Sequence, residues 1–177
     1  MNEGYNYINE KLLNFRTNKD SLKIIERERP LEAERFFQKV LKTLSYVNDF
    51  VTNHNAKKDI KKILNRHLSD EIQKDYFYEI WIDDMSSVCQ AFCKFLKEDS
   101  ISFWLGTKRG CKRFHVDMVP YRLLVTYAGQ GTELLPNHAA DREVFFAGKS
   151  NEEIVKNRLS LKCIKKWDIA IFKGGRD

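Results

Sequence analysis

The chain has 177 residues, of which 42% are hydrophobic and 32% are charged, a composition typical of a soluble globular protein. Its longest apolar runs fall well short of the roughly 20 residues that cross a bilayer. The first residues, MNEGYNYINEKLLNF, lack the hydrophobic region of a signal peptide, so we expect a cytoplasmic location and no membrane. The net charge of +6 comes from basic residues interleaved with acids, so a nucleic-acid partner is not expected.

The first half of the chain predicts mainly helices. Apolar residues recur there at helical spacing, and one short strand, SLKIIERERP, is expected before them, ended by Pro30. Ser69 or Asp70 is the expected cap of the longest helix. The expected helical ranges are 1–20 (a loose arm or a short helix), 31–51, 60–67 and 69–97.

After Ser100 the period changes to that of strands, separated by glycine and proline turns. The helical turns expected at 151–159 interrupt them. We predict an α+β fold in a single domain, 1–177, with a mainly helical part, 1–98, and a mainly β part, 99–177, in a jelly-roll-like arrangement, either complete or incomplete. The expected strands are 101–105, 111–117, 122–127, 143–147, 161–165 and 168–175.

The four cysteines have no secretory context, so free thiols are expected. Cys89 and Cys93 lie four residues apart on an apolar helical stripe, which favours buried structural thiols over a metal or redox pair.

The segment CKRFHVD, 111–117, raises the question of function. On a strand, Cys111, Arg113, His115 and Asp117 share one face, because side chains alternate with a period of two. A histidine and a carboxylate two residues apart can hold Fe(II) or Zn(II) together with a distant third ligand. The alternative is a structural His–Asp hydrogen bond, with Arg113 paired to Asp117 or to Glu133.

The stretch CKRFHVDMVPYRLLVTYAGQGTELL, 111–135, resembles the bacterial domain-of-unknown-function family eighteen-twenty-six (DUF1826). SLKIIERERPL and DIAIFKGG are similar to its first and late strands, so the resemblance spans roughly 21–175. The residues that carry it in the middle of the chain are Cys111, Arg113, Phe114, His115, Asp117, Arg122, Leu123, Leu124, Thr126, Tyr127, Gly129, Gly131, Thr132 and Glu133, with Asp141 and Arg142 as a later pair.

The resemblance implies, by analogy, a site like that of the iron/2-oxoglutarate oxygenases, with zinc as the other metal because relatives are associated with zinc supply. His115 and Asp117 are then the metal ligands, and Arg113, Arg122 and Tyr127 bind the co-substrate, 2-oxoglutarate. The further candidates are Cys111, Thr126, Thr132, Glu133 and Arg142.

The family pattern continues to a later His-Arg-Ser-Pro segment and a closing strand, whereas this sequence stops at Asp177. The resemblance therefore implies a C-terminally shortened member that lacks a third metal ligand. An open sheet edge is expected near 169–172, covered either by the N-terminal segment or by a second copy in a homodimer. The remaining histidines, His54, His67 and His138, are expected at the surface.

Three functions remain open on these grounds. The first is a metal-dependent enzyme of the oxygenase type. The second is a non-catalytic zinc-handling or interaction protein, with Cys111, His115 and Asp117 as one zinc site. The third is an inactive relative in which the same polar residues form a structural network. The metal, the substrate and the oligomeric state do not follow from the sequence.

Overall fold

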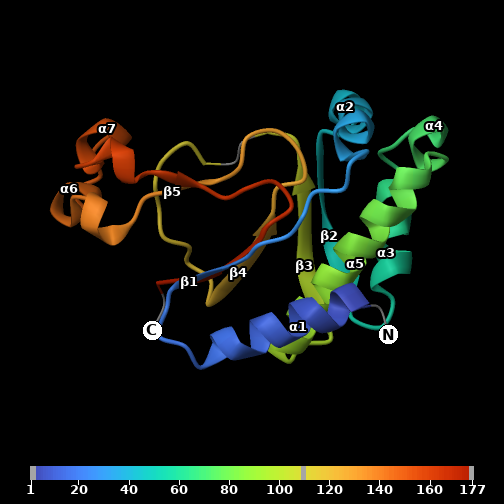
Figure 1. Cartoon of the computed structure of the whole chain (residues 1–177), viewed down its shortest axis with the longest axis horizontal. Coiled ribbons are helices and arrows are strands. Elements are labelled where there is room, and N and C mark those ends of the chain that lie inside the picture. Colours follow the sequence, from blue (N-terminus) through green and yellow to red (C-terminus); the bar gives the residue numbers. More distant parts are fainter. Residues whose placement is uncertain (1–2, 109–110, 176–177) are drawn as a thin grey trace. The chain divides into compact units, whose positions relative to one another are not determined.

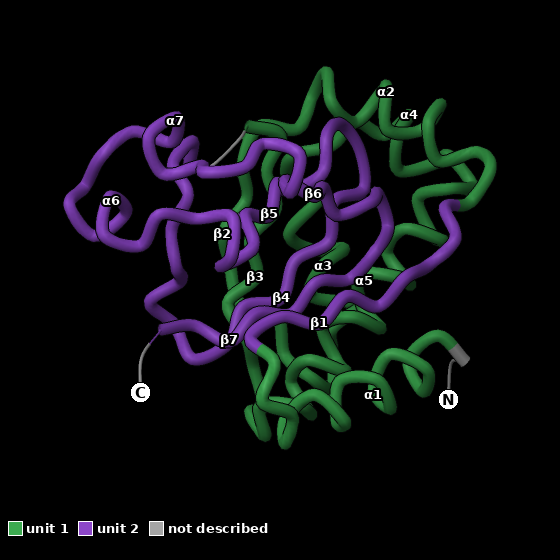
Figure 2. The backbone as a smooth tube through the Cα atoms, turned by 60° about the vertical axis from the view of Figure 1, so that its left-hand side comes forward, with its two compact units in different colours: residues 1–20, 30–108 green, residues 21–29, 109–177 purple. Residues whose placement is uncertain are grey.

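Helices and small antiparallel sheets make up the computed structural model, which confirms the α+β prediction (Figure 1). The structure describes residues 3–108 and 111–175. The chain divides into two compact units, residues 1–20 with 30–108 and residues 21–29 with 109–177 (Figure 2). Among the described residues, every helix is too short or too polar to span a membrane.

Unit 1 is built around its longest helix, α5 (Tyr76–Leu96), which contacts three other helices and both strands of the unit. Its helices and strands are α1 (Glu3–Arg16), α2 (Ala33–Thr43), β2 (Tyr46–Thr52), α3 (Ala56–Leu64), α4 (Asp70–Gln73), α5 and β3 (Ser100–Gly106). The two strands pair antiparallel. Residues 1–20 thus include a helix.

The aromatic stripe of α5 lies in the core, as its spacing predicts. Phe77 and Trp81 are each 1% exposed and pack against Phe36 and Phe37 of α2 at ring-centroid distances between 5.2 and 6.3 Å. Cys89 and Cys93 are buried free thiols, and burial raises the pKa of both. The predicted structural role of these thiols is confirmed.

The predicted helix boundaries were wrong at three places, and the first is the helix expected over 60–67, which spans Ala56–Leu64. The helix expected over 69–97 is interrupted, and α5 begins at a second cap, where Asp75 accepts a hydrogen bond from the backbone N–H of Phe77. The helix expected over 31–51 ends at Thr43 and continues as β2. Val47 and Val51 are four residues apart, so they fit either period, and pairing with β3 decides for the strand.

Unit 2 contains a three-stranded sheet in the order β1-β7-β4 and a two-stranded sheet. Its regular elements are β1 (Leu22–Ile25), β4 (Tyr121–Val125), β5 (Glu133–Leu134), α6 (Arg142–Phe146), α7 (Asn151–Ile154), β6 (Lys162–Cys163) and β7 (Ile169–Lys173), with 3₁₀ turns at Asn137–Ala139 and Arg158–Ser160. In the described residues these sheets do not make up the two larger sheets of a jelly roll.

The strand β7 lies at the centre of its sheet, so the open edge expected near 169–172 is not present. β1 pairs with one side of β7 over Leu22–Ile25, and β4 pairs with the other side over Tyr121–Val125. Ile169, Ala170 and Ile171 are fully buried, as a central strand requires. The N-terminal segment therefore covers this edge, which was one of the two alternatives.

Two predicted strands of unit 2 are absent. Residues 143–147, EVFFA, lie within and just after α6, where the carboxylate of Asp141 caps the first turn by accepting from the N–H of Val144. Residues 111–117 are irregular, because several of their polar groups bond to side chains and to a turn instead of a neighbouring strand. The presence of β-branched and aromatic residues alone does not decide whether these segments form strands.

The glycine that follows β7 lies directly against the backbone of the turn before β4. The N–H of Gly174 donates to the carbonyl of Pro120, and a Cβ at Gly174 would lie 1.8 Å from the carbonyl oxygen of Val119 and 2.6 Å from that of Asp117. Only glycine permits this approach of β7 to the turn that carries Asp117.

The substitution Gly174→Ala is expected to lower stability by about 2 kcal/mol or more, because backbone atoms must move to admit the methyl group. Thermal unfolding monitored by circular dichroism measures this loss. Gly175→Ala is the matched control, since its Cβ would meet only the side chain of Val116, at 3.1 Å. Equal melting temperatures for the two variants would contradict the steric account.

In unit 1, ion pairs join α3 to α5. Lys57 pairs with Asp83 and with Glu79, and Lys61 pairs with Glu79. The hydrogen bond from Lys61 is the main cause that lowers the pKa of Glu79 below its ordinary value of 4.5, and the bond from Lys57 acts in the same direction. The ionised carboxylate therefore stabilises the folded unit.

The variant Glu79→Gln is expected to lose about 0.5–1 kcal/mol of stability at pH 7, the range of exposed ion pairs. A lowered folded-state pKa gives stability that is present above about pH 4.5 and is lost as the pH falls through that lowered value. The stability difference between wild type and variant should therefore shrink by pH 3. Urea unfolding at the two pH values tests this, with the exposed Glu98→Gln as control.

Candidate functional site

The segment 111–117 is held in place by hydrogen bonds from the side chain of Asn151 and from its own Arg113. Asn151 at the start of α7 accepts a hydrogen bond from the N–H of Phe114 at 2.9 Å and donates to the carbonyl of Lys112 at 2.6 Å. Arg113 donates to the carbonyls of Gly148, at 2.6 Å, and Phe145, at 3.2 Å. These bonds replace a strand ladder and fix the backbone on both sides of Arg113.

His115 has one of its ring nitrogens committed by this backbone. Its Nδ1 lies 2.9 Å from the carbonyl oxygen of Arg113. A carbonyl only accepts hydrogen bonds, so Nδ1 must carry the proton. In the neutral ring this leaves a lone pair on Nε2. The side chain of His115 is 53% exposed.

Nε2 of His115 faces the carboxylate of Asp117, at 3.7 Å from Oδ1. The other oxygen, Oδ2, accepts from Nε of Arg122 at 2.8 Å, and the side chain of Asp117 is only 15% exposed. The backbone carbonyl of Asp117 accepts from the N–H of Gly175. Asp117 is thus fixed by β4 through Arg122 and by the end of β7 through its own backbone.

The arrangement brings two acceptors toward each other. A neutral imidazole Nε2 and a carboxylate oxygen repel at close range, and a cation between them, either a proton or a metal ion, removes the repulsion. Donation from the second ring nitrogen to a carbonyl is also the usual orientation of a metal-binding histidine. The predicted convergence of His115 and Asp117 therefore occurs, although not on a strand.

A complete set of protein ligands is not assembled. Within residues 3–108 and 111–175, no group of three His, Cys, Asp or Glu side chains is placed to hold a metal ion. Cys111, an exposed thiol, therefore does not complete a three-ligand zinc set with His115 and Asp117 in this conformation. The other histidines, His54, His67 and His138, are exposed, as expected.

Two of the predicted co-substrate residues are engaged in contacts of the fold. Both terminal nitrogens of Arg113 bond to backbone carbonyls, as described above. The ring of Tyr127 packs edge-on against Trp167, with ring centroids 4.9 Å apart. Arg122 differs from them, because its bond to Asp117 uses Nε and its side chain is 51% exposed.

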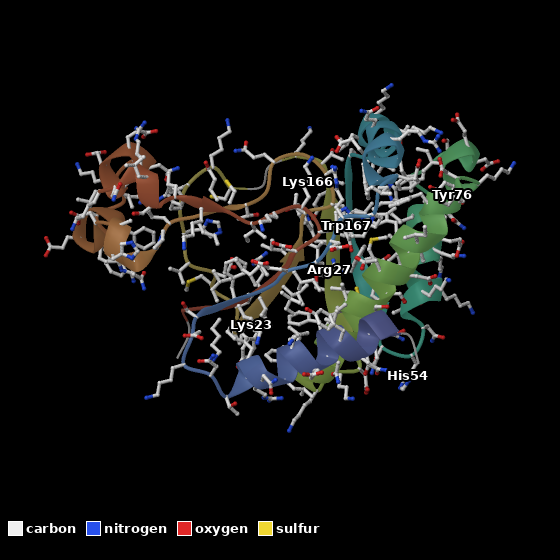
Figure 3. All side chains as sticks on the ribbon, in the orientation of Figure 1. Lys23, Arg27, His54, Tyr76, Lys166 and Trp167 are labelled. Carbon is white, nitrogen blue, oxygen red and sulfur yellow. The ribbon has the colours of Figure 1, made fainter. Side chains whose placement is uncertain are left out.

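Trp167 was missed by the sequence reasoning. It is 3% exposed and has a positive φ of 74°, a strained value for a residue with a side chain. The guanidinium of Arg27 lies over the indole, and its Nε donates to the carbonyl of Trp167 at 2.7 Å (Figure 3). The N–H of Arg27 donates to the buried carboxylate of Asp168. The alternating glutamates and arginines of residues 26–29 gave no signal of this.

Of the remaining candidates, Thr126 and Thr132 lie outside the regular elements and Glu133 lies in a strand. The carbonyls of Thr126 and Thr132 accept from the N–H groups of Trp167 and Ile164. Glu133 is in β5, opposite Cys163.

Arg142 stacks over two rings of its own helix, those of Phe145 and Phe146. Its contact with the amide oxygen of Asn137 is long, at 3.5 Å. Asp141 pairs with Lys156, and its pKa is lowered mainly by the hydrogen bond from the N–H of Val144.

The fold and the site define an α+β protein with a histidine and a carboxylate on an irregular segment and an arginine on β4 beside them. The model of the family described as "Protein of unknown function (DUF1826)" matches residues 9–176. The chain therefore belongs to the DUF1826 family, and the resemblance noted in the sequence is confirmed. Neither the search of curated proteins nor the search of solved structures found a match.

The variant Asn151→Ala is expected to release the segment that carries His115, since it loses both hydrogen bonds to this segment. The amide of Phe114 should exchange faster with solvent, and stability should fall by about 1 kcal/mol. Hydrogen exchange followed by mass spectrometry measures the first effect. Asn157→Ala, which loses one bond to the nearby N–H of Leu159, is the control. Unchanged protection of Phe114 would contradict the anchoring role.

Proposed function

We propose that unit 2 binds a divalent metal ion, Fe(II) or Zn(II), between Nε2 of His115 and Oδ1 of Asp117. The observation that carries the proposal is the orientation of the imidazole. Its Nδ1 is turned to the carbonyl of Arg113, so the lone pair of Nε2 is directed to a carboxylate oxygen 3.7 Å away.

The distance between the two donors supports this proposal. Metal–nitrogen and metal–oxygen bonds of about 2.0–2.2 Å place two neighbouring ligand atoms about 3.0–3.4 Å apart. The pair needs to close by less than about 1 Å, which rotation of the half-exposed His115 side chain can supply. Asp117 would bind through one oxygen while Arg122 keeps the other.

The position of Arg122 supports an acidic co-substrate beside the metal. Its Nε bonds to Asp117, and its terminal nitrogens make no hydrogen bond or ion pair within the described residues. A guanidinium binds a carboxylate in a bidentate manner. A small carboxylic acid such as 2-oxoglutarate would therefore be held next to open metal positions, where the metal would supply oxygen activation. The role of the protein is to orient the acid and to hold the two ligands.

The shortage of protein ligands favours a second candidate, non-catalytic zinc handling. Two ligands and solvent hold a metal ion weakly, which suits a protein that passes zinc on. Cys111 is an exposed thiol on the same irregular segment, four residues before His115, so a change of this segment would bring a thiolate to the ion. The two candidates differ in whether Cys111 contributes to affinity.

Metal uptake by the purified chain tests the proposal. We expect wild type to bind Zn(II), or Fe(II) without oxygen, with about one ion per chain. His115→Ala and Asp117→Asn should each weaken binding by about tenfold or more, the scale of a lost ligand. Isothermal titration calorimetry gives the affinity. His138→Ala is the matched histidine control and should bind as wild type does.

The thiol variant separates the two candidates. If Cys111→Ser binds Zn(II) as wild type does, the thiolate is not a ligand, and 2-oxoglutarate should then raise the affinity for Fe(II) in an Arg122-dependent manner. If Cys111→Ser loses binding together with His115→Ala, the zinc-handling candidate holds. Equal binding by wild type and His115→Ala would refute both.

A further inference from the structure

The helix α3 of unit 1 carries an unusual density of cations. Lys57 and Lys61 are paired with carboxylates of α5. Lys58, Lys62 and Arg66 are exposed, and in the described part of the chain no ion pair is found for them. These three side chains, here called the free basic stripe, are four residues apart and so lie on one side of a helix, about 6 Å from one to the next.

The stripe is continuous although α3 ends at Leu64. The N–H of Asn65 donates to the carbonyl of Lys61, and the N–H groups of His67 and Leu68 donate to the carbonyl of Leu64. Helical bonding thus continues through the following turn, and Arg66 remains in line with Lys62.

A hollow opens over these side chains. The hollow is shallow and open to solvent, so a ligand there would be held by charge and not by enclosure. Its lining is cationic apart from one amide, and its residues are Lys57, Lys58, Lys61, Lys62, Asn65 and Arg66.

The acid within this helix does not occupy the hollow. Asp59 accepts hydrogen bonds from the N–H and the hydroxyl of Thr52, at 3.0 and 2.6 Å, so its carboxylate is turned toward β2. These bonds are the main cause that lowers the pKa of Asp59, to which the charges of Lys62 and Lys58 add. The ammonium groups of the stripe keep their hydrogen-bonding capacity.

Helix stability does not account for the stripe. Cations in the last turn of a helix are favourable, which would explain Lys62 and Arg66. Lys58 lies in the first turn of α3, where a positive charge is unfavourable because it faces the positive end of the helix dipole. Unlike Lys57, it makes no ion pair with α5 within the residues that the structure describes. Binding of an anionic ligand at this position would explain the presence of Lys58.

We propose that this hollow binds a small soluble molecule that carries two or more phosphate groups. Lysine and arginine are the phosphate-binding side chains, and their spacing allows separate contacts to neighbouring phosphates. The stripe extends over only about 12 Å, the length of eight residues of helix. Nucleic acids and anionic membranes are instead held by more numerous basic contacts over a longer surface.

Titration of the full chain with tripolyphosphate in metal-free buffer tests this inference. Wild type should gain melting temperature with increasing tripolyphosphate, and inorganic phosphate at equal concentration should have a much smaller effect. The triple variant Lys58→Gln/Lys62→Gln/Arg66→Gln should bind at least about tenfold more weakly, because glutamine keeps helix propensity while it removes the charge. Isothermal titration calorimetry gives the affinities.

The matched control is Lys19→Gln/Lys42→Gln/Lys74→Gln, which removes the same charge from exposed positions of unit 1. It should bind tripolyphosphate within about twofold of wild type, and Lys62→Gln alone should show an intermediate loss. Equal loss in both triple variants, no binding by wild type, or tighter binding of single-stranded RNA or of phosphatidylserine vesicles at the same salt concentration would overturn the inference. His115→Ala should bind as wild type does, which keeps this test separate from the metal proposal.

Discussion

The pairing of β7 on both sides is the constraint on which unit 2 depends. Its three fully buried residues, Ile169, Ala170 and Ile171, read as one apolar run, and their peptide groups are satisfied by β1 and β4. This fixes the end of β7, and the close approach of Gly174 then places the turn that carries Asp117. The candidate site is therefore positioned by a hydrophobic strand that contributes no functional side chain to it.

Much of the fold followed from the sequence where the period was clear. The buried stripe of α5 and the strands at β1, β3, β4 and β7 were predicted correctly. The errors fell where period alone is ambiguous. The pattern of residues 44–51 fits a helix and a strand equally well, and EVFFA has strand-forming residues but begins beside the capping carboxylate of Asp141. Tertiary pairing and local capping decided these cases.

The candidate site shows a different mixture. The sequence predicted that His115 and Asp117 lie close together because they share one face of a strand. They do lie close together, but on an irregular backbone. The bond of Arg122 to Asp117, the anchoring by Asn151 and the contact of Arg27 with Trp167 depend on segments that are apart in the sequence. No local spacing in the sequence encodes such contacts, so they required the three-dimensional arrangement.

The placement of β1 has a consequence for how the protein forms. The chain leaves unit 1 at Ser21, forms β1 and returns to unit 1 after Arg29. The partners of β1 in β7 are residues 169–172. During synthesis β1 must wait, unpaired, until residues 169–172 have left the ribosome. Closing so long a loop is entropically costly and slow. A recombinant fragment that starts at residue 109 would expose one side of β7, whereas the same fragment supplied with a peptide of residues 21–29 would regain its missing neighbour.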